Sequence, residues 1–142
     1  MGSILTKPTH ACLHIACRFD MNQPLTTPVT LLFGPFDPTG SDGLPADAIT
    51  CAALGGHAVS TLTAITIQDS AKSESVFPCS AEQIDDQARC VLEDIPVQAI
   101  KVGALSSVAA VSAVAQIAAD YSQIPLVLHL GAHEIDTENP AE

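Results

Sequence analysis

The chain has 142 residues, near the usual size of one domain, and 16 acidic against 5 basic side chains give it a formal charge of −11. Hydrophobic residues make up 47% and aromatics only 4%, so we expect a globular core of Ala, Val, Leu and Ile. Such an acidic chain lacks the basic surface of a nucleic-acid binder and would be repelled by an anionic membrane. Its apolar runs also fall short of the ~20 residues of a membrane-spanning helix.

Five cysteines occur without a Cys-x-x-Cys pair, which is typical of reduced thiols in a chain of this length. We therefore expect a cytoplasmic protein, with Cys51 and Cys90 on helix faces. Residues 1–28 contain scattered prolines and no clear period, which predicts an irregular arm. His10 and His14, interleaved with Cys12 and Cys17, fit no familiar zinc-ligand spacing.

The regular pattern begins with a short apolar run, 29–33, which predicts a buried strand, followed by a Gly/Pro-rich loop, 34–43. Pro45 suits the first turn of a helix that ends at Gly55, and its apolar face is expected to contain Ala46, Ile49, Ala53 and Leu54. The β-branched residues 57–67 predict a strand, and 75–79 another short one.

Ser80 and Gln83 form a capping box that starts the next helix, whose buried side contains Ile84, Ala88, Val91 and Leu92 before Pro96 ends it. Residues 97–102 predict a strand, and Ser106 is expected to cap an Ala/Val-rich helix that reaches about residue 121. A strand at 126–130 and an acidic tail at 134–142 complete the order.

Strands separated by helices predict a three-layer α/β/α domain over residues 29–133, with a mostly parallel sheet covered on both faces. Ligands of such sheets bind beyond the C-terminal ends of the strands. The loops after Phe33, Ile67, Val102 and Leu130 should therefore share one rim. The most distinctive of them, 34–43, has neither a Walker nor a Rossmann glycine spacing, and by itself it is equally well explained as a plain connection.

Residues 34–47 read Gly-Pro-Phe-Asp-Pro-Thr-Gly-Ser-Asp-Gly-Leu-Pro-Ala-Asp, and the pattern continues in Ala53-Leu-Gly55, Thr63-Ala-Ile-Thr-Ile-Gln68 and Ala99-Ile-Lys-Val-Gly-Ala-Leu105. These four stretches, with Pro125 to Leu128, resemble the hydroxymethylpyrimidine/phosphomethylpyrimidine kinases of the ribokinase-like superfamily, in order and with consistent spacing. The resemblance covers residues 29–132. It implies a ribokinase-like fold and ATP-dependent phosphorylation of a pyrimidine in thiamine biosynthesis.

The resemblance implies that the pyrimidine lies on the rim, with Asp47 and Gln68 hydrogen-bonded to its ring and Thr66, Ala104 and Gly34 around it. The chemistry suits an aminopyrimidine, because a carboxylate accepts from the amino group and an amide both donates and accepts. Without the resemblance, Asp47 would be interpreted as a carboxylate on the helix surface and Gln68 as a polar residue at the end of a strand.

The chain also departs from the family pattern. Pro35 removes a backbone donor, Asp42 adds a charge, Ala104 replaces the family Met and His129 replaces the family Asp near the metal and phosphates. The family chain is about twice as long, and its second half carries the nucleotide site and the catalytic Cys. ATP and Mg are therefore expected for the family, with no phosphate clamp, catalytic residue or metal site assigned to this chain. His129 with His133 and Glu134 would point in diverging directions from a strand.

Three functions remain open from the sequence. The chain is the substrate-binding part of a kinase with a missing C-terminal half, a non-catalytic pyrimidine-binding module, or a structural module with a decayed pocket. The strand at 126–130 would lie at an uncovered sheet edge, which favours association, so we expect a homo-oligomer or a complementary half as partner, beside a small pyrimidine.

Overall fold

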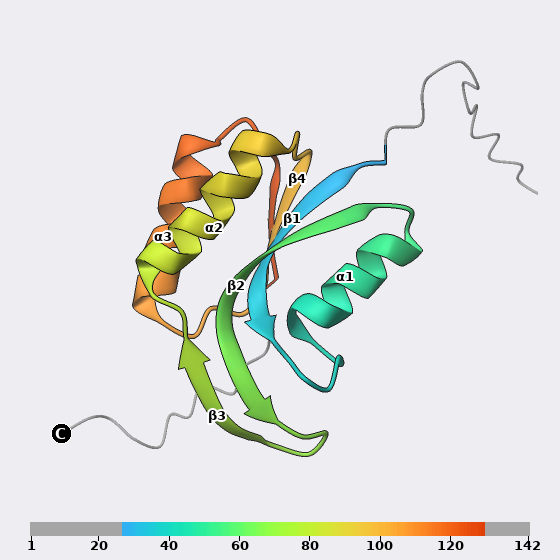
Figure 1. Cartoon of the computed structure of the whole chain (residues 1–142), viewed down its shortest axis with the longest axis vertical. Helices are drawn as coiled ribbons and strands as arrows, with labels where there is room; N and C mark the ends of the chain where they lie inside the picture. Colours follow the sequence, from blue (N-terminus) through green and yellow to red (C-terminus); the bar gives the residue numbers. More distant parts are fainter. Residues whose placement is uncertain (1–26, 130–142) are drawn as a thin grey trace, which may run out of the picture.

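The computed structural model describes residues 27–129. Residues 1–26 of the arm predicted at 1–28, the acidic tail, and the His and Cys residues named in them lie outside the described part. Figure 1 shows the course of the chain. Its elements, in order, are β1 (Val29–Phe36), α1 (Gly43–Ala53), β2 (His57–Gln68), β3 (Ser73–Pro78), α2 (Ala81–Asp94), β4 (Ala99–Val102), α3 (Val108–Asp120) and β5 (Leu126–Leu128).

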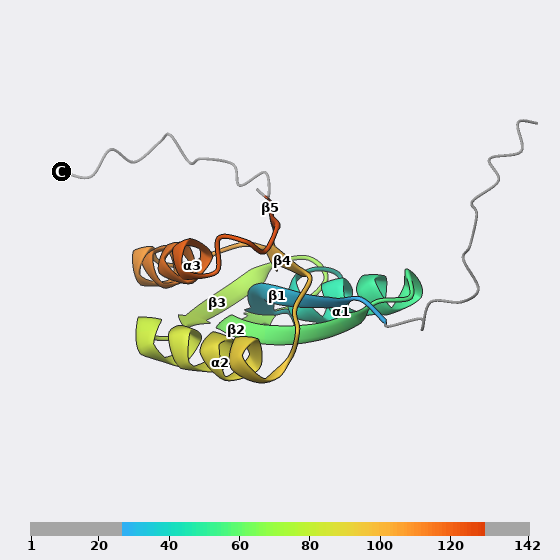
Figure 2. The same cartoon turned by 90° about the horizontal axis from the view of Figure 1, so that it is seen from above.

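The five strands form one sheet in the order β3-β2-β1-β4-β5, in which β1, β2, β4 and β5 are parallel and β3 is antiparallel to β2. Helix α1 covers one face, and α2 and α3 lie side by side on the other (Figure 2). The expected α/β/α layering with a mostly parallel sheet is confirmed. The short strand expected at 75–79 lies at 73–78 and forms a hairpin with β2, which places β3 at the sheet edge.

Strand lengths differ from the expected ones in three places. β1 continues through Gly34 to Phe36, which were predicted as loop, because Phe36 still pairs with Ile65 of β2. β4 begins only at Ala99, and β5 is three residues long. Among residues 27–129 no helix is long and apolar enough to cross a membrane.

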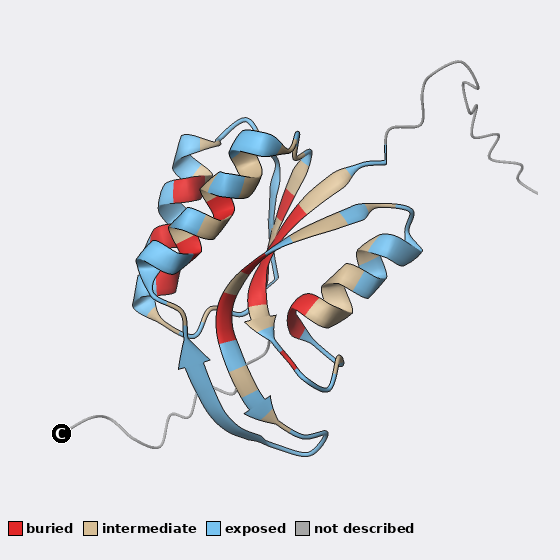
Figure 3. Ribbon diagram, in the orientation of Figure 1, coloured by how far each residue is buried: buried red, intermediate tan, exposed pale blue. Residues whose placement is uncertain are grey.

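The main core lies between the sheet and the pair α2–α3 (Figure 3). β1 contributes Leu31 and Phe33, and β4 contributes Ile100 and Val102, all on one face because strand side chains alternate. The helix side of this core consists of Ile84, Ala88, Ala110, Ala113, Val114 and Ile117. The buried side predicted for α2 is confirmed, since Val91 and Leu92 also pack against this cluster.

Two of the three helices, α2 and α3, start after a residue whose side chain caps them, whereas Asp42 before α1 makes no such hydrogen bond. The capping box of α2 is confirmed, because Gln83 N donates to Ser80 Oγ at 3.1 Å and Ser80 N donates to Gln83 Oε1 at 2.9 Å. For α3 the predicted cap was wrong by one residue. Ser107, and not Ser106, accepts a hydrogen bond from Ala110 N at 3.1 Å, so the helix begins at Val108.

Of the predicted apolar face of α1 only Ala46 is half-buried, and the prediction was wrong for Ile49, Ala53 and Leu54. Ile49 is 67% exposed and Leu54 84% exposed, whereas Leu44, Asp47, Ala48 and Cys51 are buried or half-buried at helical spacing. α1 carries apolar residues on most of its circumference, so the period alone did not decide which side meets the sheet. The side of α1 that meets the sheet contains the carboxylate of Asp47, which places a charged group between helix and sheet.

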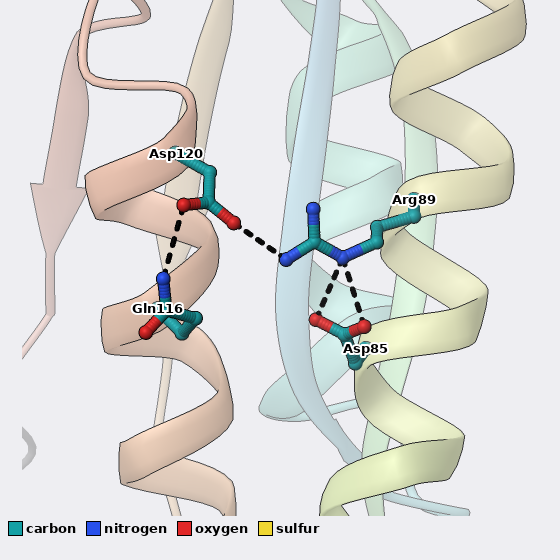
Figure 4. A network of polar contacts seen from close by, with 4 residues as sticks. All are labelled: Asp85, Arg89, Gln116 and Asp120. Carbon is teal, nitrogen blue, oxygen red and sulfur yellow. Dashed lines mark hydrogen bonds and ion pairs between the residues drawn. The ribbon is translucent and has the colours of Figure 1, made fainter.

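A polar network joins α2 to α3 (Figure 4). Arg89 donates through Nε to Asp85 at 2.8 Å and through Nη2 to Asp120 at 2.6 Å, and Gln116 donates to Asp120 at 3.0 Å. The hydrogen bonds from Arg89 and Gln116 lower the pKa of Asp120, and the two carboxylates raise the pKa of Arg89. The network lies at the surface over the main core and helps to hold the two helices together.

Candidate functional site

The candidate site lies where the parallel strands end. β1, β2 and β4 finish at this edge and are followed by three connections, residues 37–42, 69–72 and 103–107 (Figure 1). This is the rim on which ligands of open parallel sheets bind. The expected grouping of the loops after the first three parallel strands is confirmed, and residues after 129 lie outside the described part.

Asp37 organises the loop between β1 and α1. Its carboxylate, in a residue only 2% exposed, accepts hydrogen bonds from Thr39 N and Oγ1 at 2.8 Å, Asp42 N at 3.0 Å and Ser41 Oγ at 3.1 Å. Burial by itself raises the pKa of Asp37, but the hydrogen bonds from Thr39, Asp42 and Ser41 outweigh it and lower the pKa below its usual value. With its oxygens already occupied, Asp37 fixes the loop.

Gly43 lets this loop fold back onto β1. It has φ +63°, and a Cβ there would lie 2.4 Å from Pro35 O, so any other residue would clash with the backbone. At Gly34 a Cβ would lie 3.5 Å from Leu44 Cδ2, an ordinary van der Waals contact. Pro35 follows a register shift in the β1–β2 pairing, a place where a sheet tolerates proline.

Asp47 forms an ion pair with Lys101 between α1 and the sheet. Lys101 Nζ donates to Asp47 Oδ2, and the side chains are 19% exposed for the lysine and 21% for the aspartate. Asp47 Oδ1 accepts no hydrogen bond from residues 27–129. The pair adjoins the rim, because a Cβ on Gly103 would lie 3.2 Å from Lys101 Nζ and 3.9 Å from Gly34 Cα.

The ion pair lines a cavity of about 320 Å³ between α1, β1 and β4. The sheet contributes Thr30, Leu32 and Lys101, and the helix contributes Asp47, Thr50, Cys51 and Leu54, with Pro28 and Gly56 at the far end. The cavity therefore runs from the ion pair toward the N-terminal ends of the strands, away from the rim. Asp47 and Lys101 stand between this cavity and the glycines of the rim.

Thr66 and Gln68 lie at the end of β2. Thr66 Oγ1 donates to Phe36 O at 2.9 Å, so this hydroxyl ties β2 to the extension of β1. Gln68 is half-buried and is the last residue of the strand, and its side chain makes no hydrogen bond within residues 27–129. The amide is thus free for a ligand, whereas the threonine hydroxyl already has an acceptor.

Ala104 lies apart from the other expected site residues. It lines a different hollow, of about 480 Å³, on the α3 side of the sheet, together with Leu105, Leu126 and Leu128. The structure therefore brings Gly34 close to the Asp47–Lys101 pair and Thr66 to the end of β1, but it places Ala104 against α3.

Positive charge in the described part is fully paired. Its three basic side chains each contact a carboxylate: Lys72 with Glu74, Arg89 with Asp85 and Asp120, and Lys101 with Asp47. Within residues 27–129 no three His, Cys, Asp or Glu side chains come together as a metal site.

Sequence reasoning missed Asp37 and Lys101. An Asp followed two residues later by Thr is typical of a side chain that caps its own turn, which was a signal for Asp37. A lone lysine in the apolar strand Ala99–Val102 needs a partner, but its partner Asp47 is 54 residues away. No local pattern links the two.

Comparison with known proteins gives a consistent result. The family described as phosphomethylpyrimidine kinase matches residues 37–129, from the loop that Asp37 fixes to the residue after β5. A hydroxymethylpyrimidine/phosphomethylpyrimidine kinase of Streptomyces coelicolor is 41% identical over 96 residues, which are 68% of this chain and 36% of the relative. A thiamine biosynthesis bifunctional protein of Geobacter sulfurreducens is 30% identical over 121 residues, 85% of this chain and 25% of that protein.

The fold agrees with solved structures. The crystal structure of phosphomethylpyrimidine kinase from Clostridium difficile 630 superposes with a TM-score of 0.68 and 32% identity, over 72% of this chain and 44% of that chain. The expected ribokinase-like α/β/α architecture is therefore confirmed. The chain spans about a third of the length of the Streptomyces relative that it matches, so more than half of such a protein has no counterpart here.

Proposed function

Because the chain belongs to the phosphomethylpyrimidine kinase family, we propose that it supplies the pyrimidine-binding part of such a kinase. The reaction is ATP-dependent phosphorylation of hydroxymethylpyrimidine or its phosphate in thiamine biosynthesis. The observation that carries the proposal is the loop 37–42, which the hydrogen bonds of Asp37 hold in place on the rim of the parallel sheet. This loop also lies within the family match.

In this proposal the amino group of the pyrimidine donates to Asp47 Oδ1, the oxygen that Lys101 leaves free. The hydrogen bond from Lys101 fixes the orientation of that carboxylate. The side-chain amide of Gln68 makes no hydrogen bond within residues 27–129. In this proposal it donates a hydrogen bond to a ring nitrogen and accepts one from a neighbouring donor on the pyrimidine. Gly34 and Gly103 present backbone without side chains, which gives the flat ring room to approach.

We assign neither ATP nor Mg²⁺ to the described residues. Phosphoryl transfer needs charge stabilisation of the transferred group, and all three basic side chains of residues 27–129 already contact carboxylates. The same residues contain no cluster of metal ligands. We therefore assign substrate binding to this part of the chain and no step of the transfer itself.

Calorimetric titration of the chain with hydroxymethylpyrimidine tests the proposal. We expect binding that weakens at least tenfold in Asp47→Asn, since a hydrogen bond to a charged group contributes about 1.5–3 kcal/mol. Gln68→Ala should weaken it by roughly three- to tenfold, since a neutral hydrogen bond contributes about 0.5–1.5 kcal/mol. Asp47→Asn retains the size of the side chain, and circular dichroism with urea unfolding checks that the variant stays folded without the ion pair to Lys101. The matched controls are Asp86→Asn and Gln116→Ala, exposed residues on α2 and α3 that lie away from the rim.

If Asp47→Asn and Gln68→Ala leave binding unchanged, the ligand does not bind at the rim. An absence of binding by the folded wild-type chain would contradict the proposed function. Two contacts favour a structural module as the second candidate: Asp47 is paired with Lys101, and the Thr66 hydroxyl is bonded to Phe36 O. Both groups stabilise the fold whether or not a ligand binds. An absence of ligand binding would therefore favour the structural module.

A further inference from the structure

The covered side of β2 changes along the strand (Figure 3). At first the odd-numbered residues Thr61 and Thr63 are buried. Further on, the even-numbered residues are buried or half-buried, and these are Ala64, Thr66 and Gln68. The odd-numbered Ile65 and Ile67 are instead 48% and 49% exposed. The end of the strand therefore covers polar side chains and exposes isoleucines, which is the reverse of what the burial of apolar area favours.

A register shift between β1 and β2 causes this change. Gly34 pairs with Leu62. The next residue of β1, Pro35, pairs with Ala64, so Thr63 is left without a partner on β1. One extra residue exchanges the two sides of a strand for every residue that follows it. Without the shift, the two isoleucines would take the covered side, and the amide at the end of β2 would turn to the outer side.

The side chain of Gln87 on α2 is bonded to the backbone where the shift begins. Gln87 Oε1 accepts a hydrogen bond from Leu62 N at 3.1 Å, and Gln87 Nε2 donates to Leu62 O at the longer distance of 3.5 Å. Nε2 also donates to Gln83 O at 2.8 Å, which fixes the amide on its own helix. Leu62 is the last residue of β2 before the shift, so this contact holds the backbone where the register is decided.

Other groups near the shift do not share this role. The hydroxyls of Thr61 and Thr63 are buried and make no hydrogen bond within residues 27–129. Pro35 has no N–H and tolerates the shift, but it lies on β1, whereas the extra residue lies on β2. The carbonyl of Thr63 accepts from Cys79 N at 2.9 Å, a contact between backbones. Among the side chains of residues 27–129, Gln87 is therefore the one bonded to the backbone at the shift.

We propose that Gln87 is a positioning residue of the candidate site. Its amide holds Leu62 in the shifted register, and that register directs the side chain of Gln68 to the covered side of β2 at the rim. Bulges that re-aim a side chain beside a ligand site are a recurring device of β-sheets. The role of Gln68 toward a pyrimidine rests on the proposed function, whereas the register does not. Gln87 touches no ligand and acts only through β2.

NMR spectroscopy of the 142-residue chain without ligand tests the register. Phe36 pairs with Ile65 in the shifted register and would pair with Ala64 without the shift. Gln87→Met keeps the length of the side chain but removes both hydrogen bonds to Leu62. We expect the cross-strand contacts of Phe36 to move from Ile65 to Ala64 in this variant. The amide hydrogen of Leu62 should exchange at least roughly tenfold faster, because its acceptor is lost.

Two variants serve as controls. Gln116→Met is the same substitution at an exposed glutamine of α3, and Ile117→Val at a 1% exposed residue of that helix reproduces a general loss of stability. Both should keep the contacts between Phe36 and Ile65. If Gln87→Met does not fold, Gln87→Asn takes its place, since a side chain shorter by one methylene keeps an amide but withdraws it from Leu62.

Calorimetric titration with hydroxymethylpyrimidine then tests the link to Gln68. Gln87→Met should weaken binding by roughly three- to tenfold, as Gln68→Ala does, because each change removes the same neutral hydrogen bond to the ligand. The double variant should therefore bind no more weakly than Gln68→Ala alone. Gln116→Met and Ile117→Val should retain the affinity of the wild type.

Three results would overturn the proposal. They are retention of the Phe36–Ile65 contacts in Gln87→Met, separate and additive losses of affinity in the double variant, and an equal loss of affinity in Ile117→Val. If the wild type does not bind the pyrimidine but the register follows Gln87, the proposed function fails and the role of Gln87 in the register stands. If the wild type binds and Gln87→Met leaves the register unchanged, the reverse holds.

Discussion

The two faces of the sheet are built differently. The face under α2 and α3 is mostly apolar, with Leu31, Phe33 and Ile100 at most 1% exposed, although it also buries the hydroxyl of Thr61, the register partner of Phe33. The face under α1 has an ion pair, a cavity of about 320 Å³ and a helix whose Ile49 points to solvent. Burial of apolar area is the main stabilising term in folding, so the first face holds the domain together. The second face keeps polar groups near the rim, where a small molecule would be recognised.

The largest test of this difference is a cavity in the α2–α3 face. Ile117→Ala should lower the free energy of unfolding by about 3 kcal/mol, because Ile117 is 1% exposed and its neighbours cannot collapse fully into the space. The matched control, Ile49→Ala on α1, should change it by less than about 0.5 kcal/mol. Urea unfolding followed by circular dichroism measures both. Similar losses in the two variants would remove the contrast between the faces.

A smaller loss is expected from the charged pair of the α1 face. Lys101→Met leaves the carboxylate of Asp47 without its partner in a site about 20% exposed, and should cost about 2 kcal/mol. The double variant Lys101→Met with Asp47→Leu should be more stable than Lys101→Met alone. A double-mutant cycle in urea gives the coupling, which we expect to be about 1 kcal/mol or more. Additive effects would show that the two side chains act independently.

Asp37 makes the rim sensitive to acid. Asp37→Asn should cost about 1 kcal/mol at pH 7, because a neutral amide cannot accept all the hydrogen bonds from Thr39, Ser41 and Asp42. The pKa of Asp37 is lowered on folding, so its contribution is present above the ordinary value of 3.8 and is lost as the pH falls through the lower folded value.

Urea titrations of wild type and Asp37→Asn between pH 7 and pH 2 should therefore converge at the acid end. Asp86→Asn on α2 serves as the control for removing one carboxylate. A difference that stays constant down to the lowest pH would mean that Asp37 acts through the shape of its side chain and not through its charge.

The smallest effect belongs to the network over the α2–α3 face. Arg89→Met should lower the urea midpoint only slightly, because ion pairs at the surface contribute little. The decrease should shrink further in roughly 1 M salt, where the screening length is about 3 Å. An effect as large as that of Ile117→Ala would make the network, and not the apolar core, the main link between the helices.

Local signals in the sequence predicted the elements of the fold well. Ser80 and Gln83 cap α2 as expected, because both partners lie within one helical turn. The buried side of α2 was also correct, since its acidic residues mark the solvent side unambiguously. On α1 the same reasoning failed, because apolar residues occur on most of the helix and the residues facing the sheet include Asp47.

The candidate site depends on contacts that no local pattern encodes. Lys101 finds Asp47 only after β4 has paired with β1 and α1 has packed on the same face. Ala104 lies two residues after β4, yet it lines the hollow of about 480 Å³ between α3 and β5, because the connection to α3 crosses to that side of the sheet. The sequence located the rim through its loops, but the partners of each side chain on it required the fold.

The position of β1 has a consequence for synthesis on the ribosome. β1 is made first, but it occupies the middle of the sheet, and β4, one of its two partners, is separated from it by α1, β2, β3 and α2. The helices that cover Leu31 and Phe33 are also made later. A growing chain that has released only β1, α1, β2 and β3 therefore exposes an apolar strand. Such nascent chains are prone to aggregate and are the kind that chaperones protect.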